Sequence, residues 1–95
     1  MFPKPLMVKS LDNYKIWLKY SDDVEGELDL SHLAHKGVFN DWDENDLFSK
    51  VYISNETNAI AWNKIIELCP NSLYLELRNM TFREWEQTEL EYATN

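Results

Sequence analysis

The sequence is poor in cysteine, glycine and long apolar runs, and each shortage excludes a class of protein. Its single cysteine, Cys69, cannot form an intramolecular disulfide, so we expect a reducing, cytoplasmic location. Gly26 and Gly37 are its only glycines, so it has no Gly-rich loop of the kind that cradles phosphate groups. No apolar run approaches the roughly 20 residues of a membrane-spanning helix. We therefore expect no membrane partner.

Basic residues are also scarce. Nine lysines and arginines stand against seventeen acidic residues, which gives a formal net charge of -8. The basic residues are scattered singly, whereas nucleic-acid binding depends on clustered lysines and arginines that neutralise phosphates. We therefore expect no direct binding to nucleic acid and favour a basic protein as the partner.

The residues that are present indicate one α+β domain. A chain of 95 residues is long enough for one hydrophobic core and too short for two. From residue 5 to residue 30 the pattern predicts a small antiparallel sheet, a three-stranded meander. Its clearest strand is 14–20, where Tyr14, Ile16, Leu18 and Tyr20 alternate with Lys15, Trp17 and Lys19. Two apolar runs, 51–53 and 59–62, predict a second hairpin around the polar residues 55–58.

Short helices are expected to pack with these strands. Ser31 can begin a helical turn that ends at Gly37, residues 38–42 read as a loop with inward aromatic side chains, and 45–50 form another helical turn. Pro70 suits the first position of a helix over 71–78. The alternation of leucines and polar residues in that segment also fits a strand, and the sequence leaves both open.

A C-terminal helix is predicted from Thr81, because Thr81 and Glu84 form a capping box. We therefore divide the chain into a domain over residues 1–80 and a helical extension over 81–95, packed on it or frayed. The helix has an apolar face interrupted by Glu89 and made by Phe82, Trp85, Tyr92 and Ala93. Before it, four residues are predicted to lie in the core: Trp62, Ile65, Ile66 and Leu68.

The chain resembles a family of small, mostly bacterial proteins known only as domain of unknown function 2442. The resemblance covers about the first eighty residues and rests on Lys9-Ser10-Leu11, Tyr14, Ser21-Asp22, Gly26 to Leu30, Gly37-Val38-Phe39, Phe48 and the segment from Ala61 to Tyr74. It implies an α+β fold and no established activity. It also implies an antitoxin-like partner role, because genes of this type often sit beside those of another small family.

Two histidines are the main candidates for a metal. His32 and His35 are three residues apart and could hold an ion together with Asp29. Two histidines are too few for a protein zinc site, and no His-Glu-x-x-His element supplies a third ligand. We therefore expect no metal, cofactor or catalytic site. A metal-binding protein or minor enzyme that uses His32 and His35 is the alternative function.

Other reactive patterns have simpler interpretations. The run Asp41–Asp46 has oxygen ligands where a calcium loop needs them, but the loop's glycine and final glutamate are replaced by Asp46 and Tyr52. We interpret it as a solvated acidic loop. Cys69, between Leu68 and Pro70, reads as a small buried hydrophobe. It would be a nucleophile only if the fold placed a histidine beside it.

The leading hypothesis is a non-enzymatic protein-interaction module whose partner is a small basic protein, such as a toxin, or a second copy of the chain. Glu25, Glu27 and Asp29 alternate along one strand and would form its acidic face. Trp17 lies between lysines on the polar face of its strand, where it is covered either by this chain's helices or by a partner. The candidate interaction surface is therefore Trp17 with the three carboxylates.

Overall fold

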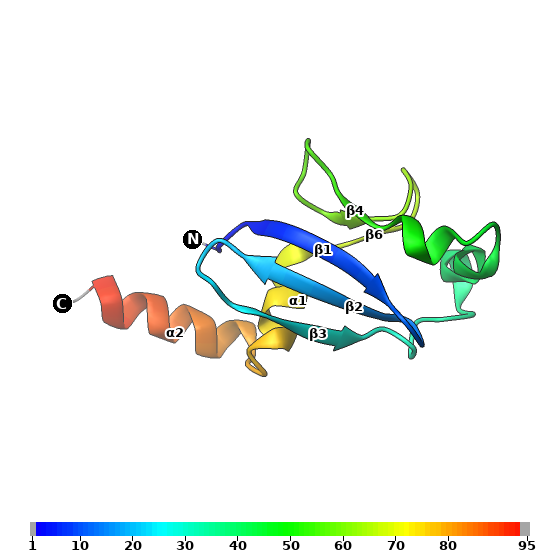
Figure 1. The fold of residues 1–95 in the computed structure, drawn as a ribbon. Helices are drawn as coiled ribbons and strands as arrows, with labels where there is room; N and C mark the ends of the chain where they lie inside the picture. The colour runs from blue at the N-terminus through cyan, green and yellow to red at the C-terminus, as the bar shows by residue number, and fades with distance from the viewer. Residues whose placement is uncertain (1, 94–95) are drawn as a thin grey trace.

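A computed structural model describes the backbone of residues 2–93 and the side chains of residues 2–88. It confirms the α+β class and the three-stranded meander, in which β1 (Pro5–Leu11), β2 (Lys15–Tyr20) and β3 (Glu25–Asp29) pair antiparallel in chain order (Figure 1). The alternation of β2 sends Ile16, Leu18 and Tyr20 to one face, where all three side chains are fully buried. The sheet therefore has one face in the core.

The second hairpin is also confirmed, and it carries a third strand that was not predicted. β4 (Tyr52–Ile53), β5 (Ile60–Ala61) and β6 (Glu67–Leu68) form a small antiparallel sheet in that order. The turn before β6 is closed by Asn63, whose Oδ1 accepts the N–H groups of Ile65 at 2.8 Å and Ile66 at 2.7 Å. This turn leaves Ile65 75% exposed, so its predicted place in the core is wrong, whereas Ile66 is fully buried.

The segment between the sheets contains two 3₁₀ helices. Residues 31–36 form successive turns, and Gly37, predicted to end them, instead begins the helix η1 (Gly37–Asp43) with a φ of 53°. The expected loop over 38–42 is therefore helical, although its Trp42 is buried as predicted. The predicted turn at 45–50 is confirmed as η2 (Leu47–Lys50).

The segment after Cys69 is a helix, so the strand alternative is wrong. α1 (Pro70–Leu77) begins with proline at its first turn, where the missing N–H costs no hydrogen bond. It packs on β3, and the Cδ2 atom of Leu77 lies 3.1 Å from where a Cβ on Gly26 would stand. Gly26 therefore allows the helix to approach the strand closely. The Tyr20 hydroxyl donates to the Pro70 carbonyl oxygen at 2.6 Å and joins the helix to β2.

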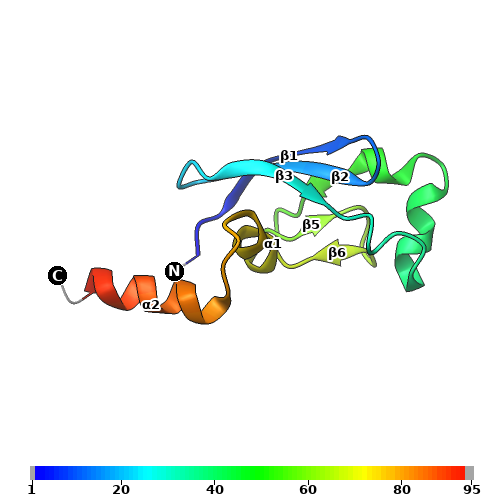
Figure 2. The same cartoon turned by 90° about the horizontal axis from the view of Figure 1, so that it is seen from below.

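The C-terminal helix α2 (Phe82–Ala93) begins with the predicted capping box. Thr81 N–H donates to Glu84 Oε1 and Glu84 N–H donates to Thr81 Oγ1, both at 3.2 Å. Trp85 stacks on Phe2 with ring centroids 3.9 Å apart, which holds the first turns of α2 against the N-terminal segment. Beyond them α2 extends away from the sheets (Figure 2). The side chains of Glu89, Tyr92 and Ala93, which were predicted to interrupt or form the apolar face of this helix, lie outside the described side chains. The division of the chain into a domain and an extension at residue 80 stays a prediction.

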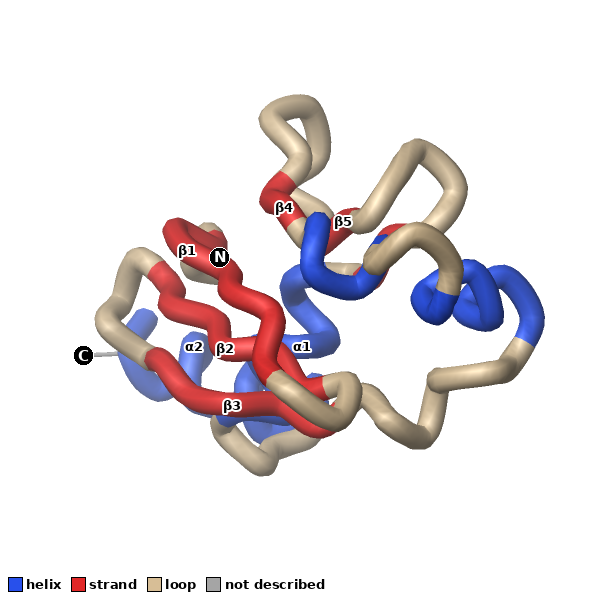
Figure 3. Tube along the Cα trace, turned by 45° about the vertical axis from the view of Figure 1, so that its right-hand side comes forward, coloured by secondary structure: helices blue, strands red, loops and turns tan. Residues whose placement is uncertain are grey.

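The two sheets and α1 form two layers. Figure 2 shows α1 and the second sheet on the same side of the β1–β2–β3 sheet, and the tube in Figure 3 shows the second sheet rising beside β1. The core lies between these layers. On the other side of the first sheet, no element of the described chain packs, and we call this side the open face. No helix of the described chain is long and apolar enough to cross a membrane.

Candidate functional site

The structure brings the four predicted interaction residues together on the open face. Trp17, Glu25, Glu27 and Asp29 lie on adjacent strands, on the face opposite the buried Ile16, Leu18 and Tyr20. Figure 2 shows α1 and α2 on the other side of this sheet. The alternative in which this chain's own helices cover Trp17 is therefore wrong. Trp17 is half-buried by its neighbours, and Lys9 Nζ lies 5.4 Å from its ring centroid, at cation–π distance.

The register of the sheet compensates the acidic charges of the open face. Each carboxylate of β3 stands in a cross-strand row that also contains a lysine from β1 or β2. The rows are Met7–Lys19–Glu25, Lys9–Trp17–Glu27 and Leu11–Lys15–Asp29. Lys19 and Glu25 form a salt bridge of 3.9 Å. The open face is therefore charge-balanced, and the acidic excess of the chain lies elsewhere.

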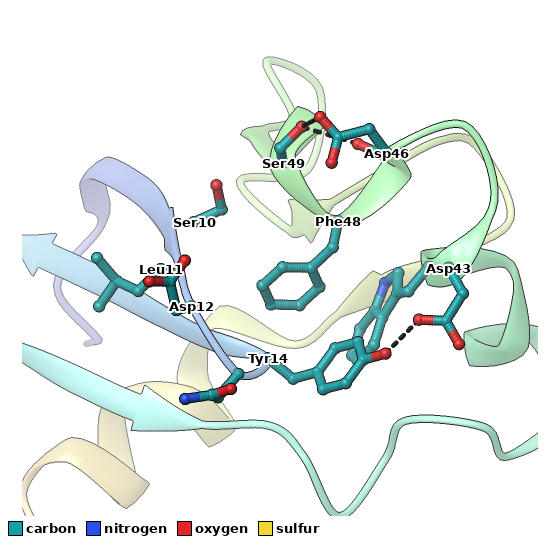
Figure 4. Close-up of a pocket in the computed structure, with 10 residues that line it drawn as sticks. Ser10, Leu11, Asp12, Tyr14, Asp43, Asp46, Phe48 and Ser49 are labelled. Atoms are coloured by element: carbon teal, nitrogen blue, oxygen red, sulfur yellow. Dashed lines mark hydrogen bonds between the residues drawn. The ribbon is translucent and has the colours of Figure 1, made fainter.

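One part of that excess surrounds a cavity of about 570 Å³ at the end of the first sheet, which we call the acidic cavity. The β1–β2 turn forms one wall, and η1, η2 and the turn between them form the other (Figure 4). It is lined by Ser10, Leu11, Asp12, Asn13, Tyr14, Trp42, Asp43, Asp46, Phe48 and Ser49. The cavity thus combines three aromatic rings with three carboxylates.

Tyr14 connects the two walls. It was predicted to begin the strand, but β2 begins at Lys15, and Tyr14 has a φ of 60° in the tight turn. A left-handed conformation is a genuine outlier for a bulky residue, so tertiary contacts must hold it. Its hydroxyl donates to Asp43 Oδ1 (Figure 4). This hydrogen bond is the largest cause that raises the pKa of the Tyr14 hydroxyl, followed by burial and by the charge of Asp43.

The carboxylates of the cavity differ in their partners. Asp43 Oδ2 lies 3.0 Å from His35 Nδ1, and Asp46 Oδ2 accepts the Ser49 hydroxyl at 2.8 Å. Within the described residues, His35 is the only salt-bridge partner of Asp12, Asp43 or Asp46. No lysine or arginine of the described chain forms a salt bridge with these three carboxylates. The predicted solvated loop at Asp41–Asp46 therefore includes one carboxylate that is held in place by two side chains from other segments.

Stacked and perpendicular rings form the apolar part of the cavity. Phe48 stands nearly perpendicular to Tyr14 and to Trp42, with centroid distances of 5.5 and 4.9 Å. Trp42 packs in turn on Trp62, 4.9 Å away. Trp62 Nε1 donates to the Phe48 carbonyl oxygen at 3.0 Å. In contrast, Trp42 Nε1 is buried and has no acceptor in the part of the chain that the structure describes.

Among the described residues, the structure does not bring Asp29, His32 and His35 together as one possible metal site. His35 contacts Asp43, whereas hydrogen bonds from the Ser31 hydroxyl and N–H lower the pKa of the Asp29 carboxyl. His32 borders another cavity, of about 330 Å³, next to α1. No three His, Cys, Asp or Glu residues among those described could hold one metal ion.

Cys69 is exposed, so its interpretation as a buried hydrophobe is wrong. It precedes α1 at the N-cap, which puts its side chain at the surface. Partial burial raises the pKa of its thiol, but hydrogen bonds from Ser72 and from the Asn71 N–H outweigh it and lower that pKa. His32 borders the same cavity as Cys69, and no hydrogen bond joins these two side chains in the described structure.

Sequence reasoning missed the acidic cavity because its residues come from segments about thirty positions apart. The only local signal was Tyr14, an aromatic residue directly after the turn formers Asp12 and Asn13. Comparison with known proteins adds a family and no activity. Residues 6–79 match the model of a family described as "Protein of unknown function (DUF2442)". No match was found to a curated protein or to a solved structure.

Proposed function

Since this chain belongs to the DUF2442 family, whose description states no function, we propose from its own surface that it is a non-enzymatic module that binds a small basic protein. We place it in the cytoplasm, as the acidic partner of a toxin-like protein. The observation that supports this proposal is the acidic cavity, where carboxylates without lysine or arginine partners surround exposed parts of an aromatic cluster. Such a surface attracts cations and repels phosphates.

The distribution of charge favours this end of the molecule as the docking surface. The open face offers as many lysines as carboxylates, so it gives little net attraction to a basic partner. Around the cavity, acidic residues predominate, and we call this group the acidic lobe: Asp12, Asp41, Asp43, Glu44 and Asp46. All five are exposed. Charges of one sign gathered at one end steer association with an oppositely charged partner.

The open face would add contact area to this interface. Trp17 is only half-buried there, and tryptophans often supply much of the binding energy when a partner completes their burial. In the described chain β3 pairs only with β2, so its outer edge is available to a partner as well. Trp17, Glu25, Glu27 and Asp29 therefore stay a predicted secondary contact surface.

Affinity capture from the native host with two matched double variants tests the proposal. Asp12→Asn with Asp46→Asn removes two charges from the acidic lobe, whereas Glu25→Gln with Glu27→Gln removes two from the open face. We expect the wild type to retain a basic protein in stoichiometric amount at low salt and to lose it at moderate salt. The lobe variant should retain less than the open-face variant. Recovery of no stoichiometric basic protein would overturn the proposal.

A second copy of this chain is the other partner that the sequence suggested. The net charge of -8 opposes self-association through the acidic lobe, so a dimer would have to use the open face. Light scattering of the purified protein over a range of concentrations separates the two partners. A constant monomer mass, together with capture of a basic protein, is the expected result.

A further inference from the structure

The acidic cavity is shaped for a particular chemical group, and this inference rests on the proposed function and specifies how the partner is recognised. Rings of Tyr14, Trp42 and Phe48 line it in two orientations, because Phe48 is inclined at 83° to Tyr14 and at 78° to Trp42. A cation over the face of such rings is attracted by their electron density. A flat apolar ligand would gain nothing from the carboxylates, and an anion would be repelled by them.

The carboxylates give the cavity a negative charge. Within the described residues, Asp12 has no salt bridge, and the Asp46 carboxylate accepts a hydrogen bond only from the Ser49 hydroxyl. Asp43 is fixed by Tyr14 and His35, so its position does not have to be ordered when a ligand binds. An incoming cation would thus meet one preorganised carboxylate and two whose charges are uncompensated by lysine or arginine.

Trp42 forms part of the cavity wall but is almost fully enclosed by its neighbours. Trp42 is 2% exposed and lines the cavity, and its Nε1–H finds no acceptor in the described chain. Buried donors in native proteins nearly always have a partner. This N–H has almost no accessible surface, so recognition of a ligand rests on the carboxylates and on the Tyr14 and Phe48 rings, which suit an organic cation with an alkyl stem better than a bare metal ion. The absence of a three-ligand metal cluster among the described residues points the same way.

We infer that the acidic cavity receives the ammonium or guanidinium end of a lysine or arginine side chain of the partner protein. The Tyr14 and Phe48 rings contact the alkyl stem and the charged end, and Asp12, Asp43 and Asp46 neutralise the charge. Recognition of a single basic side chain would explain how one small domain selects a basic protein.

Titration of the purified full chain with short capped peptides tests this inference without the unknown partner. Each peptide has one central lysine or arginine, and the matched control has norleucine, which keeps the alkyl chain and lacks the charge. The readout is the two-dimensional amide and indole NMR spectrum. We expect the charged peptides to shift the Trp42 indole N–H and the Tyr14 amide more than the Trp17 indole, and norleucine to leave all three unchanged.

Three variants assign the effect to named groups. Asp46→Asn keeps the size and the left-handed backbone that Asp46 adopts, and it should weaken binding up to roughly fivefold. Phe48→Leu removes a ring but keeps the backbone carbonyl that Trp62 uses, and it should weaken binding roughly two- to fivefold. Glu56→Gln, at an exposed residue of the β4–β5 turn that belongs to neither proposed surface, is the control and should leave the affinity unchanged. The native spectrum of each variant reports that it is folded.

The outcomes that overturn the inference are specific. Equal shifts with norleucine would show an apolar site, and shifts centred on Trp17 would place recognition on the open face. Equal shifts with a divalent cation alone would show a metal site. If no peptide binds while a basic partner is still captured, this inference fails and the proposed function stands. If the peptides bind but no basic partner is found, the site exists and the proposed function fails.

Discussion

Trp42 and Trp62 are neighbouring buried indoles that differ in one hydrogen bond, so replacing each with phenylalanine isolates the energy of that bond. Their ring centroids are 4.9 Å apart, and they are 2% and 3% exposed. Trp62 Nε1 donates to the Phe48 carbonyl oxygen, whereas Trp42 Nε1 has no acceptor in the described chain. Both substitutions remove the same atoms, so the difference between their effects reports the pairing of the two N–H groups.

The magnitudes follow from these two environments. Replacing tryptophan with phenylalanine removes part of a buried ring, which costs about 1–2 kcal/mol in each variant. This cost lies between that of deleting one methyl group and that of deleting a whole ring. Trp62→Phe also takes the donor away from the Phe48 carbonyl, which adds about 1–3 kcal/mol. Trp42→Phe instead removes an unpaired donor whose burial already costs about 1–3 kcal/mol. We therefore expect Trp62→Phe to destabilise by about 2–5 kcal/mol and Trp42→Phe by no more than about 1 kcal/mol.

Urea unfolding followed by far-ultraviolet circular dichroism measures both free energies, because this signal comes mainly from the backbone and each variant is fitted with its own baselines. Equal dependence of the free energy on urea in all three proteins would show that the variants unfold from comparable native states. An equal or larger cost for Trp42→Phe would refute the reasoning. It would mean that Trp42 Nε1 has an acceptor in the free protein.

Gly26→Val should lower the free energy of unfolding by about 1–3 kcal/mol, because its side chain would press on Leu77 Cδ2, while Gly26→Ala should cost less since Leu77 can shift. Equal costs in urea unfolding would contradict this. Burial, followed by the charges of Cys69, Tyr74 and Asp22, raises the pKa of Tyr20 above its ordinary value of 10.0. Above pH 10.0 the unfolded chain loses the proton of the Tyr20 hydroxyl while the folded chain keeps it. The free energy of unfolding should therefore fall as the pH rises, and it should fall less steeply in Tyr20→Phe. A wild-type stability that stays flat in alkaline urea titrations would exclude the linkage. Thr81→Ala should destabilise α2 by about 1 kcal/mol through loss of the bond to the Glu84 N–H, and Thr81→Ser should preserve it, as hydrogen exchange in α2 can show.

The cavity and the open face give the proposed module two surfaces of different character. In the proposed function, the acidic lobe would provide attraction and a place for one basic side chain, and the open face would provide area that is electrically balanced. Attraction of this kind acts mainly on the rate of association, and the contact area acts mainly on how long the complex persists. Charge-removing variants of the lobe and a Trp17→Ala variant should therefore affect association and dissociation rates, respectively.

Several elements were predictable because short-range interactions decide them. The alternation along β2, the proline at the start of α1 and the reciprocal bonds of Thr81 and Glu84 each involve residues no more than a few positions apart. Their geometry is therefore fixed wherever the segment lies in the fold. The ambiguous leucine pattern of 73–77 became a helix because Leu73 and Tyr74 could be buried against the first sheet.

Other expectations failed where a residue's surroundings depend on distant segments. Ile65 is apolar, but pairing of β6 with β5 puts it at the tip of a turn that Asn63 closes. Cys69 was expected inside and lies at the exposed N-cap of α1. Hydrophobicity indicates that burial is favourable for a side chain, but only the tertiary fold shows whether space for it exists.

The sequence by itself determined the fold class, the main strands and helices, the family and the acidity of the chain, because composition and local patterns are sufficient for these properties. Only the tertiary structure decided where on the surface the acidic residues gather without basic neighbours. Strand register placed a lysine in each row with the carboxylates of β3, and the packing of η1 and η2 beside the β1–β2 turn brought Tyr14 to Asp43. Both outcomes depend on contacts between residues far apart in the chain, and local propensities do not encode such contacts.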